Sequence, residues 1–445
     1  MNAVAETAQP YVPHFEALQK AERDTTVEWL KALRLRAFRR FAEHGFPAER
    51  HEDWKYSNTR ALQKLRLHSA VTQPAALDSQ WLAPAELQLP GARRLVFVDG
   101  VPVANLGTRT QADGLKITPL AQALGDGSGR LEKLLLPEAL WADDPFTALN
   151  TAFLAHGVLI AIADAAHIAA PLQVLFVSTP QSAPQVSHPR VIVRLGKNAR
   201  LTLIESHYGL ERAANFTNSC TQIDLGAGAA LDYLAMQREA AGDFHVSRVY
   251  ASQHENSRLE THTYNLGGQW VRNDLKISLE APGASVRMDG LYLVDQHRHV
   301  DNHTRIDHLV PHTSSDELYR GIIRERGHAV FNGKVVVAEP AIKTDAIQTN
   351  NNLLLTRNGE IDTKPELEIY ADDVKCAHGA TIGQLDEEAL FYLRSRGLDL
   401  ETARALLTGA FARVITGRIA DPKLRQFALA QLAGSLPQLA AEGSA

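Results

Sequence analysis

Hydrophobic positions along this chain follow a strand-like spacing in its middle and a helix-like spacing at its two ends. From about residue 93 they fall in short alternating runs, such as RRLVFVDG, LQVLFVST, PRVIVRLG and ARLTLIESH. These runs are rich in Val, Ile and Thr and are bounded by Gly, Asn or Pro, which is typical of β-strands joined by turns. A helical pattern interrupts these strand-like runs at about residues 116–156, and the strand pattern then continues to about Val374. The sequence therefore predicts a mainly β central region.

A repeat of turn and strand lies within this region. Gly-rich or Asn-rich turns precede similar strands in GKNARLTL, GAGAALDY, HENSRLET and PGASVRMD. The aligned apolar positions are Leu201, Leu231, Leu259 and Val286, separated by 30, 28 and 27 residues. Repeats of this length indicate a stacked solenoid, and they leave no room for the helix that a βαβ crossover needs. We therefore expect a β-helix, or β-solenoid, whose coils stack one apolar column.

The N-terminal part of the chain is expected to be helical. Residues 13–45 show a helical pattern with an apolar stripe. Thr25 or Thr26 can cap the start of a helix here, and Gly45 and Pro47 can end it. A second short helix is expected after the turn in HEDWKYSNTRALQKL, residues 51–65. A stretch rich in Pro and Gly, from about Gln73 to Gly91, is interpreted as the connection to the β region.

Helical pattern returns after Gly379. Asp386 and Asp399 are placed to cap two helices, EEALFYLRSR and LETARALLTGAFARVITG, and a third is expected from about Pro422 to Leu432. The second helix carries an apolar stripe that comprises Leu400, Ala403, Leu407, Ala410 and Phe411. Most of this stripe is interpreted as the core of a helical bundle, and any part that stays exposed could dock a partner. A solenoid has exposed ends that need caps, and the terminal helices suit that purpose.

The expected organisation has three parts. An N-terminal helical domain covers residues 1–90, a β-helix core covers 91–380, and a C-terminal helical domain that binds a partner covers 381–445.

Composition narrows the class of protein. The net charge of -5 argues against a protein that binds nucleic acid or a membrane surface through a basic patch. The N-terminus lacks a secretory signal pattern, and the most apolar run, residues 156–172, is interrupted by charge and shorter than the ~20 residues of a spanning helix. Two cysteines are too few for a disulfide framework. We expect a cytoplasmic protein.

Motifs of common enzymes are missing from the chain. It contains no G-x-x-x-x-G-K-[ST] loop for nucleotide phosphates, no G-x-S-x-G elbow and no C-x-x-C pair. We therefore expect no nucleotide to bind to this chain through a P-loop.

Histidines gather in QHRHVDNHTRIDHLVPHT. They are His297, His299, His303, His308 and His312. Only residues two apart share a face of a strand, so His297 and His299 could bind one metal ion while the others point in uncertain directions. The alternative is that the histidines, with Asn302 and Thr304, form hydrogen-bonding rungs on the solenoid wall.

Cys376 and His378 form a second candidate, in DDVKCAHGAT. Their spacing places both side chains on one face of an extended segment, and Gly379 follows where strand gives way to helix, so they are expected near an end of the stack. Thiolate and imidazole are ligands for iron or zinc. A cluster takes about four ligands, so any metal role would need a second chain. The other cysteine, Cys220, is interpreted as core.

Long strings in residues 320–398 resemble the SufB/SufD family of iron–sulfur cluster assembly proteins, with the closer match to its SufD branch. They are AVFNGKV, AIKTDAIQTNNNLL, DTKPELEIYADDVKCAHGAT and EEALFYLRSRG, and HEDWKYSNT resembles the family's N-terminal motif. The resemblance covers most of the chain and weakens between about Leu65 and Arg190.

The resemblance implies a right-handed parallel β-helix between helical domains. It implies a non-catalytic scaffold subunit that pairs with SufB, the ATPase SufC binding to each of them. A transient iron–sulfur cluster would form between the subunits, where the residue matching His378 faces a SufB cysteine; Cys376 matches a neighbouring family cysteine. Residues 386–435 match the region that carries SufC. In isolation, an exposed solenoid sheet is expected to form a homodimer.

Two other functions stay open at this point. A stand-alone β-helix enzyme acting on polysaccharides would need convergent carboxylates, for which Asp289, Asp295 and Asp301 are candidates. A membrane-transporter component is suggested only by the implied ATPase, and the lack of a spanning segment argues against it.

Overall fold

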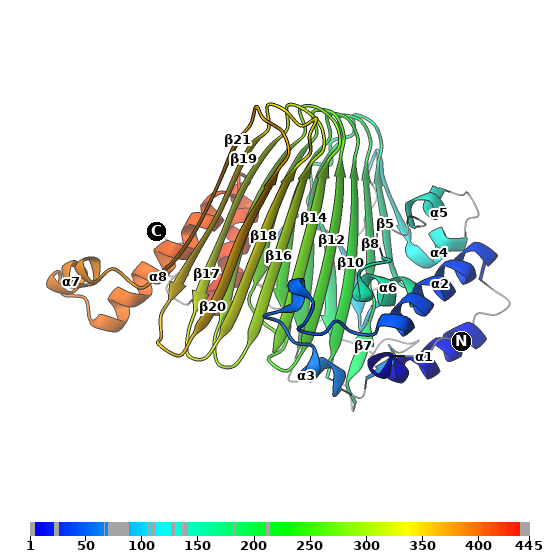
Figure 1. Ribbon diagram of the computed structural model, residues 1–445, viewed down its shortest axis with the longest axis horizontal. Coiled ribbons are helices and arrows are strands. Elements are labelled where there is room, and N and C mark those ends of the chain that lie inside the picture. Colours follow the sequence, from blue (N-terminus) through cyan, green and yellow to red (C-terminus); the bar gives the residue numbers. More distant parts are fainter. Residues whose placement is uncertain are drawn as a thin grey trace.

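The central part of the chain is a β-solenoid built from two long sheets (Figure 1). The structure is a computed structural model, and it describes residues 5–21, 26–65, 67–69, 89–104, 107, 112–125, 130–135, 137, 141–180, 183–210 and 214–436. From β8 onward, successive strands alternate between the two sheets and each pairs in parallel with the strand one coil away. The prediction of a mainly β solenoid is therefore confirmed.

The strands have the following bounds. Sheet A contains β4 (Leu115–Pro119), β5 (Gly157–Ile162), β8 (Arg190–Leu195), β10 (Phe216–Leu225), β12 (Phe244–Gln253), β14 (Trp270–Leu279), β16 (His299–His308), β18 (His328–Val337) and β20 (Glu360–Ile369), with β7 (Gln185–Ser187) beside β10 and β1 (His68–Ser69) beside β7. Sheet B contains β2 (Arg93–Val98), β3 (Val101–Pro102), β6 (Leu172–Ser178), β9 (Arg200–Gly209), β11 (Ala230–Arg238), β13 (Arg258–Asn265), β15 (Ser285–Val294), β17 (Ser314–Ile323), β19 (Asp345–Leu354) and β21 (Lys375–Gly383). The pairs β2–β3 and β4–β5 are antiparallel.

The apolar column predicted from the repeat is present in sheet B. Leu201, Leu231, Leu259 and Val286 pair directly with one another from coil to coil, and all four are buried. The column then continues through Ser315 and Ala346 and ends at Cys376. Because in-register parallel neighbours point to the same side of a sheet, one face of every coil is committed to the interior.

The N-terminal helices pack on the outer face of sheet A. They are α1 (Val12–Ala21), α2 (Glu28–His44) and α3 (Arg60–Gln63), with short 3-10 turns at Glu6–Tyr11 and Glu52–Trp54. Their buried aromatic residues form one cluster with side chains of β10, β12 and β14. The single helical pattern at residues 13–45 is thus two helices. The residue at the N-terminal cap position of α2 is Val27, whose side chain makes no capping hydrogen bond. The prediction that Thr26 caps this helix is therefore wrong, and Thr25 lies outside the described residues.

The connection expected from Gln73 to Gly91 also falls outside the described residues, except for 89–91. The helical interruption contains α4 (Leu120–Gly125), α5 (Arg130–Leu135) and α6 (Pro145–Ala152), but its first residues belong to β4.

The N-terminal motif HEDWKYSNT is held on sheet A by a buried arginine. Arg272 donates to the carbonyl oxygen of Asp53 at 2.7 Å and to Asp301 at 2.7 Å. Its guanidinium also lies 4.2 Å from the ring centre of Trp54. Removing one partner of such a buried pair leaves an uncompensated charge, so this arginine fixes the motif to the solenoid.

Three C-terminal helices are confirmed: α7 (Glu387–Ser395), α8 (Leu400–Gly417) and α9 (Pro422–Ala433). Asp386 and Asp399 cap the first two through hydrogen bonds from backbone amides, as predicted. The position of the change from strand to helix is wrong, however, because β21 runs on to Gly383.

The C-terminal helices flank sheet B rather than capping the stack. In the predicted stripe on α8 only Ala403 is buried, and Ala410 is exposed. The face that packs against β15 and β17 holds Thr408, Gly409, Ala412, Ile415 and Thr416. The bundle-core interpretation is therefore wrong, because small side chains on another face let α8 lie close against the sheet. The predicted boundaries at residues 90 and 380 stay predictions.

The stacked column should dominate stability. Replacing Leu231 with alanine leaves a cavity between coils, and we expect it to lower the free energy of unfolding by about 2–5 kcal/mol. Urea unfolding followed by circular dichroism measures this. Thr202→Ala, at a partly exposed position of β9 beside the same column, is the control and should cost much less. If both variants lost the same free energy of unfolding, the stacked column would contribute no more to stability than its neighbouring positions.

Candidate functional site

The last strand of sheet B carries both candidate ligands at an open end of the solenoid. Among the described strands β21 pairs only with β19, and β20, the last strand of sheet A, pairs only with β18. Most of β21 is exposed, including His378, whereas Cys376 is half-buried against the core. Figure 1 shows β21 and β20 at the end of the stack opposite the N-terminal helices. The expected position near an end is confirmed.

His378 continues an inward-facing column of side chains. It pairs in register with Gln348, which pairs with Glu317 one coil further in, and both of these are buried. The neighbouring position Ile347 is 49% exposed and marks the outward face. His378 and Cys376, two residues apart, therefore share the face that lines the interior. No further coil covers this face among the described strands, so His378 is exposed and Cys376 is only half-buried.

The Cys376 thiol is held in its neutral form. Partial burial, and then the charge of Asp345, raise the pKa of this thiol. Because the thiolate is the form that binds metals, a metal at Cys376 must displace a proton against this shift. Cys220 is fully buried, its pKa is raised by burial, and the prediction that it belongs to the core is confirmed.

A titratable group lies behind His378 in the interior. Gln348 donates its amide to Glu317 at 2.7 Å. Burial raises the pKa of Glu317 to about 7, although Thr304 and Gln348 act in the opposite direction. The column that leads inward from His378 therefore contains a carboxyl group that changes charge near neutral pH.

The histidines of residues 297–312 are dispersed. His297 is exposed in a turn, while His299 contacts Ser57 at 2.7 Å. His303 lies 3.1 Å from Asp301, and His308 is buried between two hydroxyl groups. Within the described ranges none of these histidines belongs to a group of three possible metal ligands.

The rung interpretation holds for part of that region. Asn273 donates to Asn302 one coil away at 3.1 Å, so one amide pair joins β14 and β16.

The carboxylates required by the polysaccharide hypothesis are engaged in ion pairs. Asp289 pairs with Arg418 at 2.6 Å and Asp301 with Arg272 at 2.7 Å, and both carboxylates are buried. Asp295 lies 2.6 Å from Arg298. These three side chains connect structural elements and do not converge on a groove.

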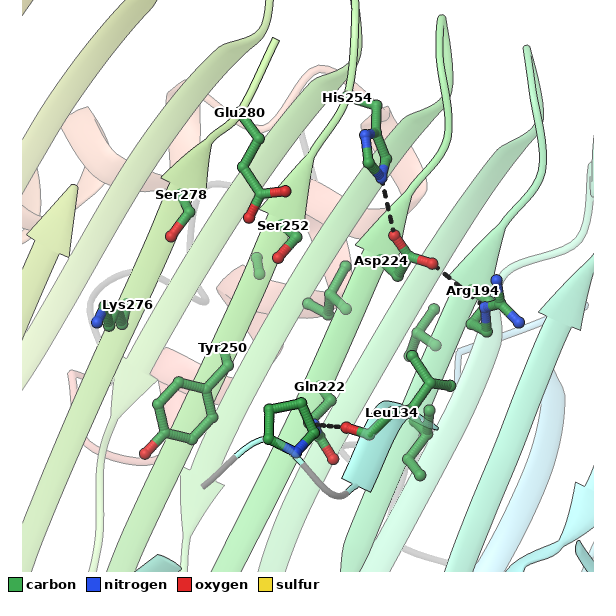
Figure 2. A pocket seen from close by; sticks show the side chains of 15 residues that line it. Leu134, Arg194, Gln222, Asp224, Tyr250, Ser252, His254, Lys276, Ser278 and Glu280 are labelled. Carbon is green, nitrogen blue, oxygen red and sulfur yellow. Dashed lines mark hydrogen bonds and ion pairs between the residues drawn. The ribbon is translucent and has the colours of Figure 1, made fainter. Parts of the chain in front are cut away.

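A groove of about 420 Å³ does lie on the outward face of β8, β10, β12 and β14 (Figure 2). Asp224 in its wall lies between Arg194 at 3.2 Å and His254 at 3.4 Å. Of the side chains labelled there, Asp224 contacts Arg194 and His254, and Gln222 donates to the carbonyl oxygen of Leu134. Three strands of sheet A separate the groove from the open end.

Two groups of possible metal ligands escaped the sequence analysis. They are His207, Glu239 and His245, which are buried, and His328, Glu360 and Asp362, which are partly exposed. His207, Glu239 and His245 come from three segments whose separation in sequence follows no motif, while Glu360 and Asp362 share β20 and His328 lies on β18. Only the coil register, which is a property of the folded chain, brings them together.

Comparison with known proteins identifies the family of this chain. A family model described as the SufBD core domain of SUF system FeS cluster assembly matches residues 176–411, and one for the SufBD N-terminal region matches residues 5–174. The chain belongs to the SufB/SufD family.

Similar proteins carry the same description. The chain is 33% identical to the iron–sulfur cluster assembly protein SufD of Escherichia coli over 88% of its own length and 90% of the relative. It is 32% identical to a SufBD family protein of Synechocystis over 88% of the chain and 86% of the relative. A SufBD family protein of Mycobacterium leprae is 28% identical over 84% of the chain and 95% of the relative.

Family membership assigns the general role. The chain acts in iron–sulfur cluster assembly as a scaffold-type subunit of the SUF system. In the part of the chain that the structure describes, no helix is long and apolar enough to cross a membrane.

Stability should depend on pH through Glu317. Its folded pKa of about 7 exceeds its ordinary value of 4.5, so the folded state binds the proton more tightly. The contribution of Glu317 to the free energy of unfolding should be fully present below about pH 4.5 and fall by about 3 kcal/mol as the pH rises to 7. Urea unfolding from pH 5 to 8 should show this fall, reduced in Glu317→Gln. A wild-type slope retained in that variant, as expected for the exposed control Glu280→Gln, would contradict the assignment.

Proposed function

We propose that this chain is a SufD-type subunit that pairs with a SufB-like subunit at the open end of its solenoid. There it offers His378 to a nascent iron–sulfur cluster shared between the two chains. The supporting observation is the place of His378: an exposed imidazole on the terminal, one-sided strand of the stack. The cluster is the cargo of the assembly reaction and not a resident cofactor.

The open end has the properties of a pairing edge. β20 and β21 each present one unpaired edge to solvent. Apolar side chains are exposed beside them, with Ile369 at 42%, Tyr370 at 64% and Ile382 at 51%. An exposed long edge with apolar side chains is a template for a strand of another chain. In isolation the same edge would pair with a second copy, as expected of a homodimer.

The ligands at this end are too few for a cluster. His378 and Cys376 supply at most two of about four ligands, so the partner must supply the rest. The exposed imidazole is the better placed of the two, because the Cys376 thiol is half-buried and its pKa is raised. We therefore assign His378 as the cluster ligand and Cys376 as a secondary one.

The C-terminal helices offer a separate surface for a SufC-like ATPase. Helix α7 projects beyond the solenoid (Figure 1) and exposes Phe391 at 75% and Tyr392 at 57%. Exposed aromatic residues are frequent anchors of protein interfaces. Helix α8 connects α7 to sheet B, where Arg418 pairs with Asp289 and Asp316. A partner bound at α7 could therefore act on the solenoid, and nucleotide would bind that partner.

Loss of the imidazole should remove the cluster without dissolving the complex. We expect His378→Ala to co-purify with the SufB-like and SufC-like subunits at wild-type stoichiometry but with several-fold less iron and acid-labile sulfide. The matched control is Lys375→Ala, an exposed substitution on the same strand. Wild-type cluster content in the histidine variant would refute a ligand role for His378.

Truncation of the α7 aromatic residues should affect a different partner. We expect the double variant Phe391→Ala, Tyr392→Ala to weaken binding of the SufC-like ATPase by at least about tenfold, because each truncated interface anchor costs more than about 1 kcal/mol. Titration calorimetry measures this. Pairing with the SufB-like subunit should be unchanged, and Glu387→Ala on the same helix should bind normally. Unchanged ATPase binding by the double variant would exclude this surface.

A further inference from the structure

A buried group of His and Glu side chains lies inside the solenoid, far along the stack from β21. His207 is near the end of β9, Glu239 directly follows β11, and His245 is at the start of β12. All three are at most 5% exposed. One ligand atom from each lies within 4.8 Å of the other two. Three metal-ligating groups thus converge where solvent is excluded.

Two nitrogen atoms of this group have no hydrogen-bond partner. The Nδ1 atoms of both His207 and His245 are buried without a hydrogen bond, and only that of His245 has an ion-pair contact, with Glu239. His245 Nδ1 lies 2.9 Å from a carboxylate oxygen of Glu239, but outside the direction of a hydrogen bond. A buried polar atom without a partner is costly, and an ion between these atoms would satisfy both nitrogens at once.

The remaining polar atoms are arranged as in the outer layer of a metal site. Glu205 contacts Nε2 of His207 at 3.0 Å, which leaves Nδ1 as the free nitrogen of that ring. Thr217 donates to one oxygen of Glu239 at 2.6 Å and Gln237 to the other at 3.1 Å. Carboxylates and hydrogen-bond donors of this kind orient metal ligands.

We propose that His207, Glu239 and His245 bind one divalent transition-metal ion, Zn²⁺ or Fe²⁺, with water in the remaining position. Two imidazole nitrogens and one carboxylate oxygen suit these ions, whereas Mg²⁺ and Ca²⁺ prefer oxygen ligands. Metal–ligand bonds of about 2.0–2.2 Å would draw the three atoms to roughly 3.3 Å from one another. The ion would join β9, the β11–β12 connection and the start of β12 at one edge of the coil, so its role is structural.

The other ligand group is a natural control. His328, Glu360 and Asp362 are partly exposed, and Nε2 of His328 already contacts Asp362 at 2.9 Å. That group lies at the open end of sheet A, so substituting His328 separates binding there from binding in the interior.

Metal binding by the complete chain tests the proposal. The chain, prepared without an affinity tag and stripped with a chelator, is dialysed against Zn²⁺ or, without oxygen, against Fe²⁺, and its metal content is measured by mass spectrometry. We expect one tightly bound ion per chain and a higher melting temperature with the ion. Glu239→Gln and His245→Gln should bind at least about tenfold more weakly. Two control variants should bind the metal ion as the wild type does. They are His328→Asn, in the other ligand group, and His262→Gln, which replaces a buried histidine outside both groups.

Several results would overturn the proposal. They are a folded wild-type chain that binds neither ion, binding that persists in both interior variants, and binding lost only with His328. If the interior variants fail to fold, X-ray absorption of the metal-loaded wild-type chain decides. Two imidazole ligands and at least one oxygen support the site, and a first shell without two imidazoles refutes it.

Discussion

Register between successive coils is the constraint on which this structure depends. Each strand pairs in parallel with the strand one coil away, so a residue's position in one coil determines its neighbours along the stack. A slip by one residue would turn a whole apolar column outward. The column that begins at Leu201 and ends at Cys376 exists because this register is kept across seven strands of sheet B.

A stack held in this way also has an end, and both candidate ligands, Cys376 and His378, lie on the strand at that end. Inside the solenoid, each inward-facing side chain is covered by the next coil. At β21 no next coil follows among the described strands, so the column through Glu317 and Gln348 leaves His378 exposed. The proposed pairing with a second chain rests on the same geometry. An open edge favours pairing, and two ligands are too few for an iron–sulfur cluster.

The helical segments act beside the solenoid and not across its open end. The N-terminal helices cover sheet A through an aromatic cluster, and Arg272 fixes the HEDWKYSNT motif there. Helices α8 and α9 cover sheet B, leaving α7 projecting with two exposed aromatic residues. The surface proposed for the ATPase and the strand that carries His378 thus lie at different places on the molecule.

The sequence alone determined the class of fold, the spacing of its coils and the two ligand candidates at the end of the stack. These follow from local patterns: alternation of side chains, turn residues at a regular period, capping aspartates, and a cysteine two residues from a histidine. Tertiary structure decided the rest. Which face of α8 packs on the sheet depends on small residues meeting β15 and β17, and α8 therefore lies beside the stack. The His207–Glu239–His245 group likewise forms only when register brings β9, β12 and the residue after β11 together, because no spacing along the chain encodes contacts between coils.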